Sequence, residues 1–277
     1  MKPRHVLCGA IALLAAVGIA GRAKDDGPPG PEFEHAGYTL EIRELEAQTE
    51  LELTPGGERE YTIALECLLS IPPGQDDKVI AVTEELHAAA VEDTRGDDIL
   101  DRKKGKTRRK GYKSGTFEYM HKPSREIELD ETELLRDAYR VHRMRLEAQV
   151  LLAREWEYVR VPAAVTTKEQ EGPSGIRFRV AELGVDEKGH WDVEIACKRP
   201  EAGPTGPFVG RVAALDSLGR ELVDGKLQKG DPLAEESALI GEFTVPLDAE
   251  LKYVRVGIVT EYEVKTLRFE VTDIVPD

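Results

Sequence analysis

A segment that occurs twice along the chain constrains the fold more than any other feature of the sequence. Residues 61–67 (YTIALEC) and 191–197 (WDVEIAC) each place an aromatic residue, two aliphatic residues and a cysteine at alternate positions, 130 residues apart. Because successive side chains of a β-strand point to opposite faces, this period of two indicates a strand with one buried face. Its recurrence predicts two copies of one structural unit.

Three further matches occur in the same order in the two halves of the chain. They pair 40–45 with 178–183, 91–96 with 214–219, and 155–157 with 261–263. The offset between matching residues falls from 123 at the second of these matches to 106 at the last. A duplication followed by an insertion in the first copy explains this order.

The remaining apolar segments also favour strands. Residues 253–259 and 267–271 alternate apolar with polar side chains, and turn-forming stretches separate the segments. Residues 134–156 are rich in helix formers, but the alternation within 143–152 indicates a strand, with a short helical turn near 131–138. We therefore expect an all-β chain that forms two tandem antiparallel β-sandwich domains by internal duplication.

This layout resembles that of exported bacterial proteins with tandem immunoglobulin-like or fibronectin-type modules. Residues 247–253 (LDAELKY) are similar to the corner that leads such a domain into its sixth strand, and 269–276 resemble the last strand of exported β-sandwich proteins. The resemblance implies two Ig-like sandwiches, and it implies no particular activity.

The N-terminus has the pattern of a secretory signal. Lys2 and Arg4 precede an apolar run over 6–20, which is followed by small residues up to Ala23. The run has 15 residues, fewer than the roughly 20 that span a bilayer, so we expect cleavage and no stable membrane span. The protein is therefore expected to be secreted or periplasmic.

Composition along the chain predicts the domain boundaries. The expected parts are a signal peptide (1–23), a polar Gly/Pro leader (24–36), a first sandwich (37–162), a linker (163–174) and a second sandwich (175–277).

One segment reverses the acidic balance of the chain, whose net charge is −15. Residues 102–113 contain eight basic residues and no acidic ones, and this segment is expected to be a loop inserted into the first domain. Its candidate anion-binding residues are Arg102, Lys103, Lys104, Lys106, Arg108, Arg109, Lys110 and Lys113. Such a loop either binds a polyanion, such as an acidic polysaccharide, or is a solvated insertion that balances nearby acids.

The other candidate sites have simpler structural interpretations. The tripeptide at 95–97 (RGD) and the acids around it fit an ordinary turn better than an adhesion motif or a calcium loop. Cys67 and Cys197 lie on buried faces, which favours free thiols over an interdomain disulfide. Tyr61 and Trp191 are expected in the core rather than on a sugar-binding surface.

The motifs of catalysis do not occur in this sequence. The histidines are scattered, and neither H-E-x-x-H nor G-x-S-x-G is present. We expect a non-catalytic binding or structural module, without cofactor or metal, whose sandwich surfaces and loops meet a protein or an acidic polysaccharide at the cell envelope. The alternatives are acidic-polymer binding through 102–113 and a hydrolase with two carboxylates that meet only in space. Nucleic acid is not an expected partner, given the negative net charge.

Overall fold

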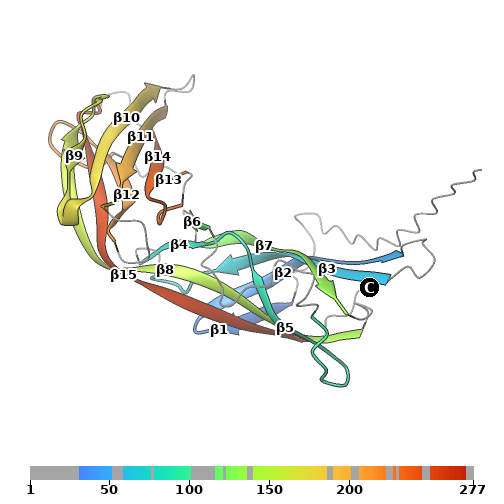
Figure 1. Ribbon diagram of the computed structural model, residues 1–277. Helices are drawn as coiled ribbons and strands as arrows, with labels where there is room; N and C mark the ends of the chain where they lie inside the picture. The colour runs from blue at the N-terminus through green and yellow to red at the C-terminus, as the bar shows by residue number, and fades with distance from the viewer. Residues whose placement is uncertain are drawn as a thin grey trace, which may run out of the picture.

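A computed structural model describes residues 31–51, 59–75, 78–100, 116–120, 123–135, 140–185, 190–200, 206–222, 227–228, 231–244 and 250–272. These residues are mostly β-strands, as Figure 1 shows, and the 3₁₀ turn η2 (Pro173–Gly175) precedes β10. The strands are β1 (Glu32–His35), β2 (Tyr38–Leu51), β3 (Arg59–Ser70), β4 (Val79–Thr83), β5 (His87–Asp93), β6 (Phe117–Tyr119), β7 (Ser124–Leu134), β8 (Val141–Pro162), β9 (Gln170–Glu171), β10 (Arg177–Val185), β11 (His190–Lys198), β12 (Phe208–Leu215), β13 (Leu227–Gln228), β14 (Glu236–Thr244) and β15 (Tyr253–Thr272). The expectation of an all-β chain is confirmed.

The strands form three sheets, and every pairing between named strands is antiparallel. Four strands pair in the order β1-β2-β3-β7, and five in the order β13-β14-β11-β10-β9. The third sheet has the order β12-β15-β8-β4-β6, with β5 also paired to β8. This arrangement is compatible with β-sandwich packing.

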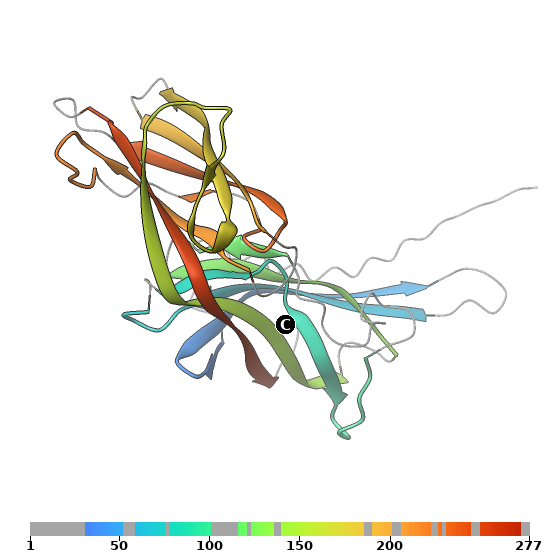
Figure 2. The ribbon, with the colours of Figure 1, turned by 60° about the vertical axis from the view of Figure 1, so that its left-hand side comes forward.

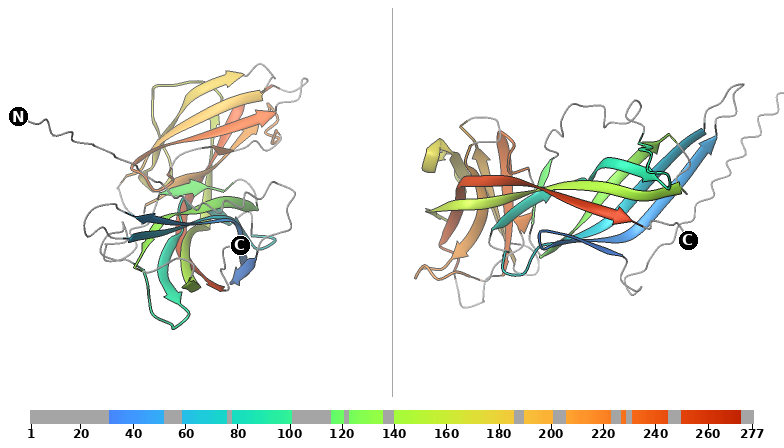
Figure 3. Two further views of the ribbon diagram at one scale, coloured as in Figure 1. Left: turned by 90° about the vertical axis from the view of Figure 1, so that its right-hand side faces the viewer. Right: turned by 90° about the horizontal axis from the view of Figure 1, so that it is seen from below.

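A ribbon of two long strands dominates the third sheet. β8 has 22 residues and β15 has 20, and they pair antiparallel from Pro162↔Tyr253 to Arg143↔Thr272. At about 3.3 Å per residue, a strand of this length spans roughly 65 Å. Figures 2 and 3 show the two strands running side by side through the whole molecule.

The buried side chains fall into two clusters, which define two lobes. In the first lobe, residues of β2, β3 and β7 such as Ile63 pack with residues of β5, β8 and β15 such as Met144. In the second lobe, residues of β10, β11 and β14 such as Phe243 pack with residues of β12, β15 and β8 such as Val256. Each alternating strand has one apolar face, and these two cores are where those faces are buried.

Each cluster draws on both sides of the expected linker at 163–174. The end of β15 supplies Leu267, Phe269 and Val271 to the first lobe, all fully buried. The second lobe contains Leu151 of β8 and Tyr119 of β6, which precede the expected linker. The lobes therefore share strands, and neither has a complete core without the other half of the chain.

The recurring segments that opened the sequence analysis lie on central strands. Cys67 of β3 stands between Ile42 and Ile127 of the neighbouring strands. Cys197 of β11 stands between Phe178 and Ser237. Each of these strands is hydrogen-bonded to a neighbour on both sides. One face of each strand lies in a core, as the alternation of apolar and polar residues predicts.

Three segments differ from their expected conformation. Residues 32–35, assigned to the leader, form β1, since Phe33 pairs with Leu40 and packs against the first core. The helical turn near 131–138 is wrong for 131–134, which continue β7 because Thr132 pairs with Ile63 and Leu134 is buried. The expected linker includes β9, which pairs with β10. In each case tertiary contacts outweigh the local polarity or helix propensity.

Candidate functional site

The eight candidate anion-binding residues within 102–113 lie outside the described residues. The chain on both sides of the segment is anchored. Leu100, buried, forms a bridge to Leu134, and Phe117, also buried, pairs with Thr83. Anion binding by this segment stays a prediction.

The acidic residues around 95–97 are engaged in a turn at the end of β5. The carboxylate of Asp93 accepts hydrogen bonds from the backbone N–H groups of Arg95 (2.9 Å) and Asp97 (3.1 Å). Asp98 accepts from the N–H of Leu100 at 3.2 Å. Gly96 has a φ of 80°, which few other residues adopt. Both carboxylates thus bind the backbone of their own turn.

Asp216 makes the equivalent turn at the end of β12. Its carboxylate accepts from the N–H groups of Leu218 and Arg220, both at 2.8 Å, and from Nε of Arg220 at 2.6 Å. Burial alone would raise the pKa of Asp216, but these hydrogen bonds outweigh it and hold the pKa below its ordinary value. The function of this carboxylate is therefore to fix the turn.

Both described cysteines are free and buried. Burial, reinforced by the charge of Glu66, raises the pKa of Cys67 to about 12. Burial also raises the pKa of Cys197, whose Sγ lies 2.8 Å from Oγ of Ser237. A thiol is nucleophilic as the thiolate, so these environments suit packing rather than chemistry.

Two further carboxyls have shifted pKa values, and both shifts are downward. Hydrogen bonding to Lys198 lowers the pKa of Glu236, and hydrogen bonding to Arg143 lowers that of Glu270. A carboxyl that donates a proton at neutral pH needs the opposite shift. Among the described residues, no three His, Cys, Asp or Glu side chains gather as metal ligands do.

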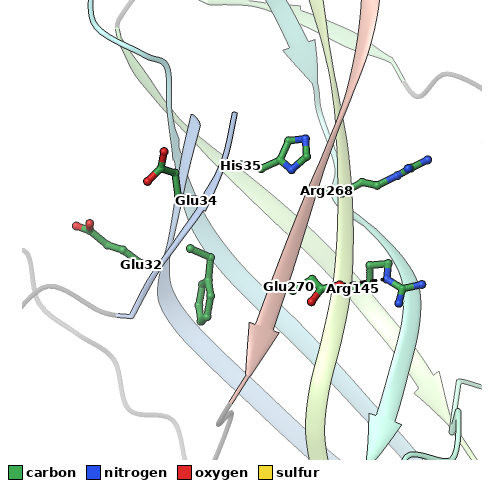
Figure 4. Close-up of a pocket in the computed structure, with 7 residues that line it drawn as sticks. Glu32, Glu34, His35, Arg145, Arg268 and Glu270 are labelled. Carbon is green, nitrogen blue, oxygen red and sulfur yellow. Dashed lines mark ion pairs between the residues drawn. The ribbon is translucent and has the colours of Figure 1, made fainter. Parts of the chain in front are cut away.

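A cavity of about 550 Å³ lies between β1 and the β8–β15 ribbon in the first lobe, as Figure 4 shows. It is lined by Glu32, Phe33, Glu34, His35, Arg145, Arg268 and Glu270. Nε of Arg268 lies 3.0 Å from Glu147, and Nε of Arg145 lies 3.9 Å from Glu270. Because both arginines already face carboxylates of the ribbon, the cavity has mixed charge and no marked preference for an ion of either sign.

The second lobe carries a different kind of surface, which we call the aromatic face. It comprises Trp156, Tyr158 and Arg160 of β8 with Tyr253, Arg255 and Gly257 of β15. The alternate residues of β15, including Val254 and Val256, belong to the second core. The aromatic face is therefore the outer side of this sheet.

Two glycines keep the rings of the aromatic face against the sheet. A Cβ at Gly257 would lie 3.1 Å from Tyr158 and 3.2 Å from Trp156. A Cβ at Gly210 of β12 would lie 2.9 Å from Trp156. The two ring planes are within 5° of parallel, with centroids 6.1 Å apart, and Tyr158 is 53% exposed. The glycines thus leave room for two aligned rings, of which Tyr158 is exposed and Trp156 is partly buried against the second core.

Two arginines of the aromatic face lie over tyrosine rings. Cζ of Arg160 lies 3.6 Å from the ring centroid of Tyr253, and Cζ of Arg255 lies 5.2 Å from that of Tyr158. Arg255 also pairs with Glu221, which lies 4.0 Å from Arg211. Cations over ring faces are attracted by the ring quadrupole, which holds both guanidinium groups beside the aromatic surface.

The aromatic face was not predicted from the sequence, although three of its residues occur at alternate positions along one segment. Trp156, Tyr158 and Arg160 occupy alternate positions and therefore share one side of a strand. The partner residues on β15 are about 100 positions further along the chain, and only the pairing of Tyr158 with Gly257 brings them together.

Comparison of the chain with known protein families, characterised proteins and solved structures finds no match. The described residues contain no helix with the length and apolarity needed to cross a membrane.

Proposed function

We propose that the chain is an exported, non-catalytic binding module built from two Ig-like β-sandwiches related by internal duplication. The supporting observation for binding is the aromatic face, on which the exposed ring of Tyr158 lies beside two partly buried rings and two arginines. Such surfaces are typical of recognition, because exposed aromatic and arginine side chains combine apolar contact with directed hydrogen bonds.

The duplication is supported by equivalent positions in the two lobes. Cys67 and Cys197 are 130 residues apart on central strands, and Asp93 and Asp216 are 123 apart in matching turns. Met144 and Val254, which lie opposite equivalent residues of β5 and β12, are 110 apart. The order of these positions is the same in both halves, as a duplicated unit requires.

The shared strands suit a module that presents surfaces in a fixed arrangement. Because β8 and β15 contribute to both cores, the two lobes are tied together through one shared ribbon, whose register shifts between Val259 and Tyr262. Surfaces held on ordered strands in this way lower the entropy lost on binding.

The proposal is tested by incubating the mature chain (24–277) with a panel of envelope polysaccharides and measuring both retention and released fragments. We expect reversible, salt-sensitive binding of at least one acidic polymer and no release of new reducing ends. Release that increases with protein concentration would show that the protein is a hydrolase and overturn the proposal.

Export is tested separately by expressing the full chain in a bacterium and sequencing the N-terminus of the protein outside the cytoplasm. We expect a new N-terminus near Ala20 or Ala23, as the small residues after the apolar run predict. Protein that stays in the cytoplasm with Met1 intact would contradict export.

The basic segment 102–113 supplies a second candidate site for the same class of polymer, because eight cations in twelve residues condense on a polyanion. Replacing the segment with a Gly/Ser linker removes these charges. If this candidate is correct, the replacement abolishes polymer binding at physiological salt, whereas unchanged binding would exclude it.

A further inference from the structure

We propose that the aromatic face binds acidic sugar chains, with the ring of a uronic acid residue lying on Tyr158 and its carboxylate paired with Arg160. This inference rests on the proposed binding function and names the class of ligand and the residues that hold it.

The shape of the aromatic face favours an extended ligand. It is the outer side of two paired strands, and β12 continues the sheet beyond β15. Tyr158 is half-exposed there, beside the parallel ring of Trp156. A sugar ring has one face of C–H groups, which packs on an aromatic ring because the contact removes apolar surface from water.

The charge of the aromatic face favours an anionic ligand. No carboxylate of the described residues pairs with Arg160, whose guanidinium lies over Tyr253 instead. A guanidinium matches a carboxylate with two parallel hydrogen bonds. Arg255 pairs with Glu221, whereas Arg160 has no carboxylate partner among the described residues, so the face is locally positive on a chain of net charge −15. A local positive field of this kind concentrates anions at the face.

The spacing of the two contacts favours a uronic acid over a nucleic acid. Tyr158 and Arg160 are alternate residues of one strand, about 7 Å apart. In a uronic acid the carboxylate is attached directly to the ring that would stack, so one sugar residue reaches both side chains. Single-stranded nucleic acids are held by successive stacked bases and many phosphate contacts. The aromatic face offers one open ring, Tyr158, and one guanidinium, Arg160, that no carboxylate of the described residues engages.

The two tryptophans of the sequence allow a direct test at the site. In a Trp191→Phe background the remaining tryptophan is Trp156, which lies beside Tyr158. We would titrate this mature protein with a galacturonic acid oligomer at low salt and follow the fluorescence of Trp156. The same oligomer with its carboxyl groups reduced to alcohols supplies the neutral control.

We expect a saturable fluorescence change. The dissociation constant should increase at least tenfold in Tyr158→Ala and in Arg160→Gln, and at least fivefold for the reduced oligomer. Leu135→Ala and Arg268→Gln are matched controls in the first lobe. Leu135 is 59% exposed and its N–H donates to the carbonyl of Ile99, and Arg268 is paired with Glu147. They should bind as tightly as the parent, and circular dichroism should show every variant folded.

Three results would overturn the inference. The first is oligomer binding that Tyr158→Ala and Arg160→Gln leave unchanged, which leaves the proposed binding function intact but places the site elsewhere. The second is binding that only the 102–113 replacement abolishes, which assigns the polymer to that segment. The third is a single-stranded DNA oligomer that binds through Tyr158 more tightly than the sugar. If no polymer of the panel binds at all, both proposals fail.

Discussion

The carboxylates of Asp93 and Asp216 each accept hydrogen bonds from the backbone N–H groups two and four residues downstream. The two turns are also closed by the same backbone hydrogen bonds. The N–H of Gly96 donates to the carbonyl of Asp93 at 2.9 Å, and that of Gly219 donates to the carbonyl of Asp216 at 3.1 Å. Both glycines have φ near 80°. One turn geometry thus ends the corresponding strand in each lobe.

We expect Asp216→Asn to lower the melting temperature in a pH-dependent way. The native pKa of Asp216 is below its unfolded value, so its ionised form stabilises the fold above about pH 4, the ordinary range of an aspartate. This stabilisation is lost as the pH falls through the native pKa. The difference between wild type and variant, measured by scanning calorimetry, should therefore be largest at neutral pH and shrink towards pH 3. A difference that grows on acidification would contradict this assignment.

Arg199 should be essential for the stability of the second lobe. Its side chain is 2% exposed and donates to the backbone carbonyls of Pro207 (3.1 Å), Leu233 (2.6 Å) and Gly206 (2.8 Å). Truncation leaves these carbonyls without donors, at about 1–3 kcal/mol each when they stay buried. We expect Arg199→Ala to lower the free energy of unfolding by about 3 kcal/mol or more in urea titrations.

Lysine at position 199 is the informative comparison with the alanine variant. It keeps the positive charge but lacks the planar fork that reaches three carbonyls at once. We therefore expect Arg199→Lys to recover only part of the lost stability. A lysine variant as stable as the wild type would show that charge alone is required.

The two lobes should unfold together. Phe269 of the shared strand β15 lies in the first core, and Phe178 of β10 lies in the second. They are 0% and 1% exposed. Each change to alanine should cost about 3–5 kcal/mol. Because β8 and β15 complete both cores, we expect each variant to shift one common transition in circular dichroism and in tryptophan fluorescence. Separate transitions, each moved by only one of the variants, would show independent lobes.

The thiols of Cys67 and Cys197 should be inert in the native protein. At pH 8 a thiol with a pKa of about 12, such as that of Cys67, is almost entirely protonated, and both side chains are buried. We expect no reaction of these two thiols with an aromatic disulfide reagent over minutes, and complete reaction once the protein is denatured in urea. Rapid modification of either thiol without denaturant would contradict the buried environment.

Particular residues show how far the sequence predicts this fold. The alternation of Tyr61, Ile63, Leu65 and Cys67 correctly predicts a strand, because the period of two is a local property of the backbone. The match of 155–157 with 261–263 has a different explanation in the structure. Glu155 and Glu261 are cross-strand partners in the ribbon. They are 106 residues apart, whereas the equivalent positions Met144 and Val254 on the same two strands are 110 apart, so Glu155 and Glu261 are not equivalent positions of a duplicated unit. Similar patterns on paired strands therefore produced one of the four matches.

The sequence alone determined that the alternating segments, such as 61–67 and 191–197, are strands and which of their faces are apolar, since both follow from the spacing of side chains along the backbone. Only the tertiary structure decided that β8 and β15 extend beyond one lobe and complete the core of the other. It also decided that Tyr158 meets Gly257 on an outer face, where two aromatic rings and their arginines lie together. The physical reason is that the spacing of apolar residues along a strand shows which side of the strand is buried. The choice of partner strand depends instead on contacts between residues far apart in the chain.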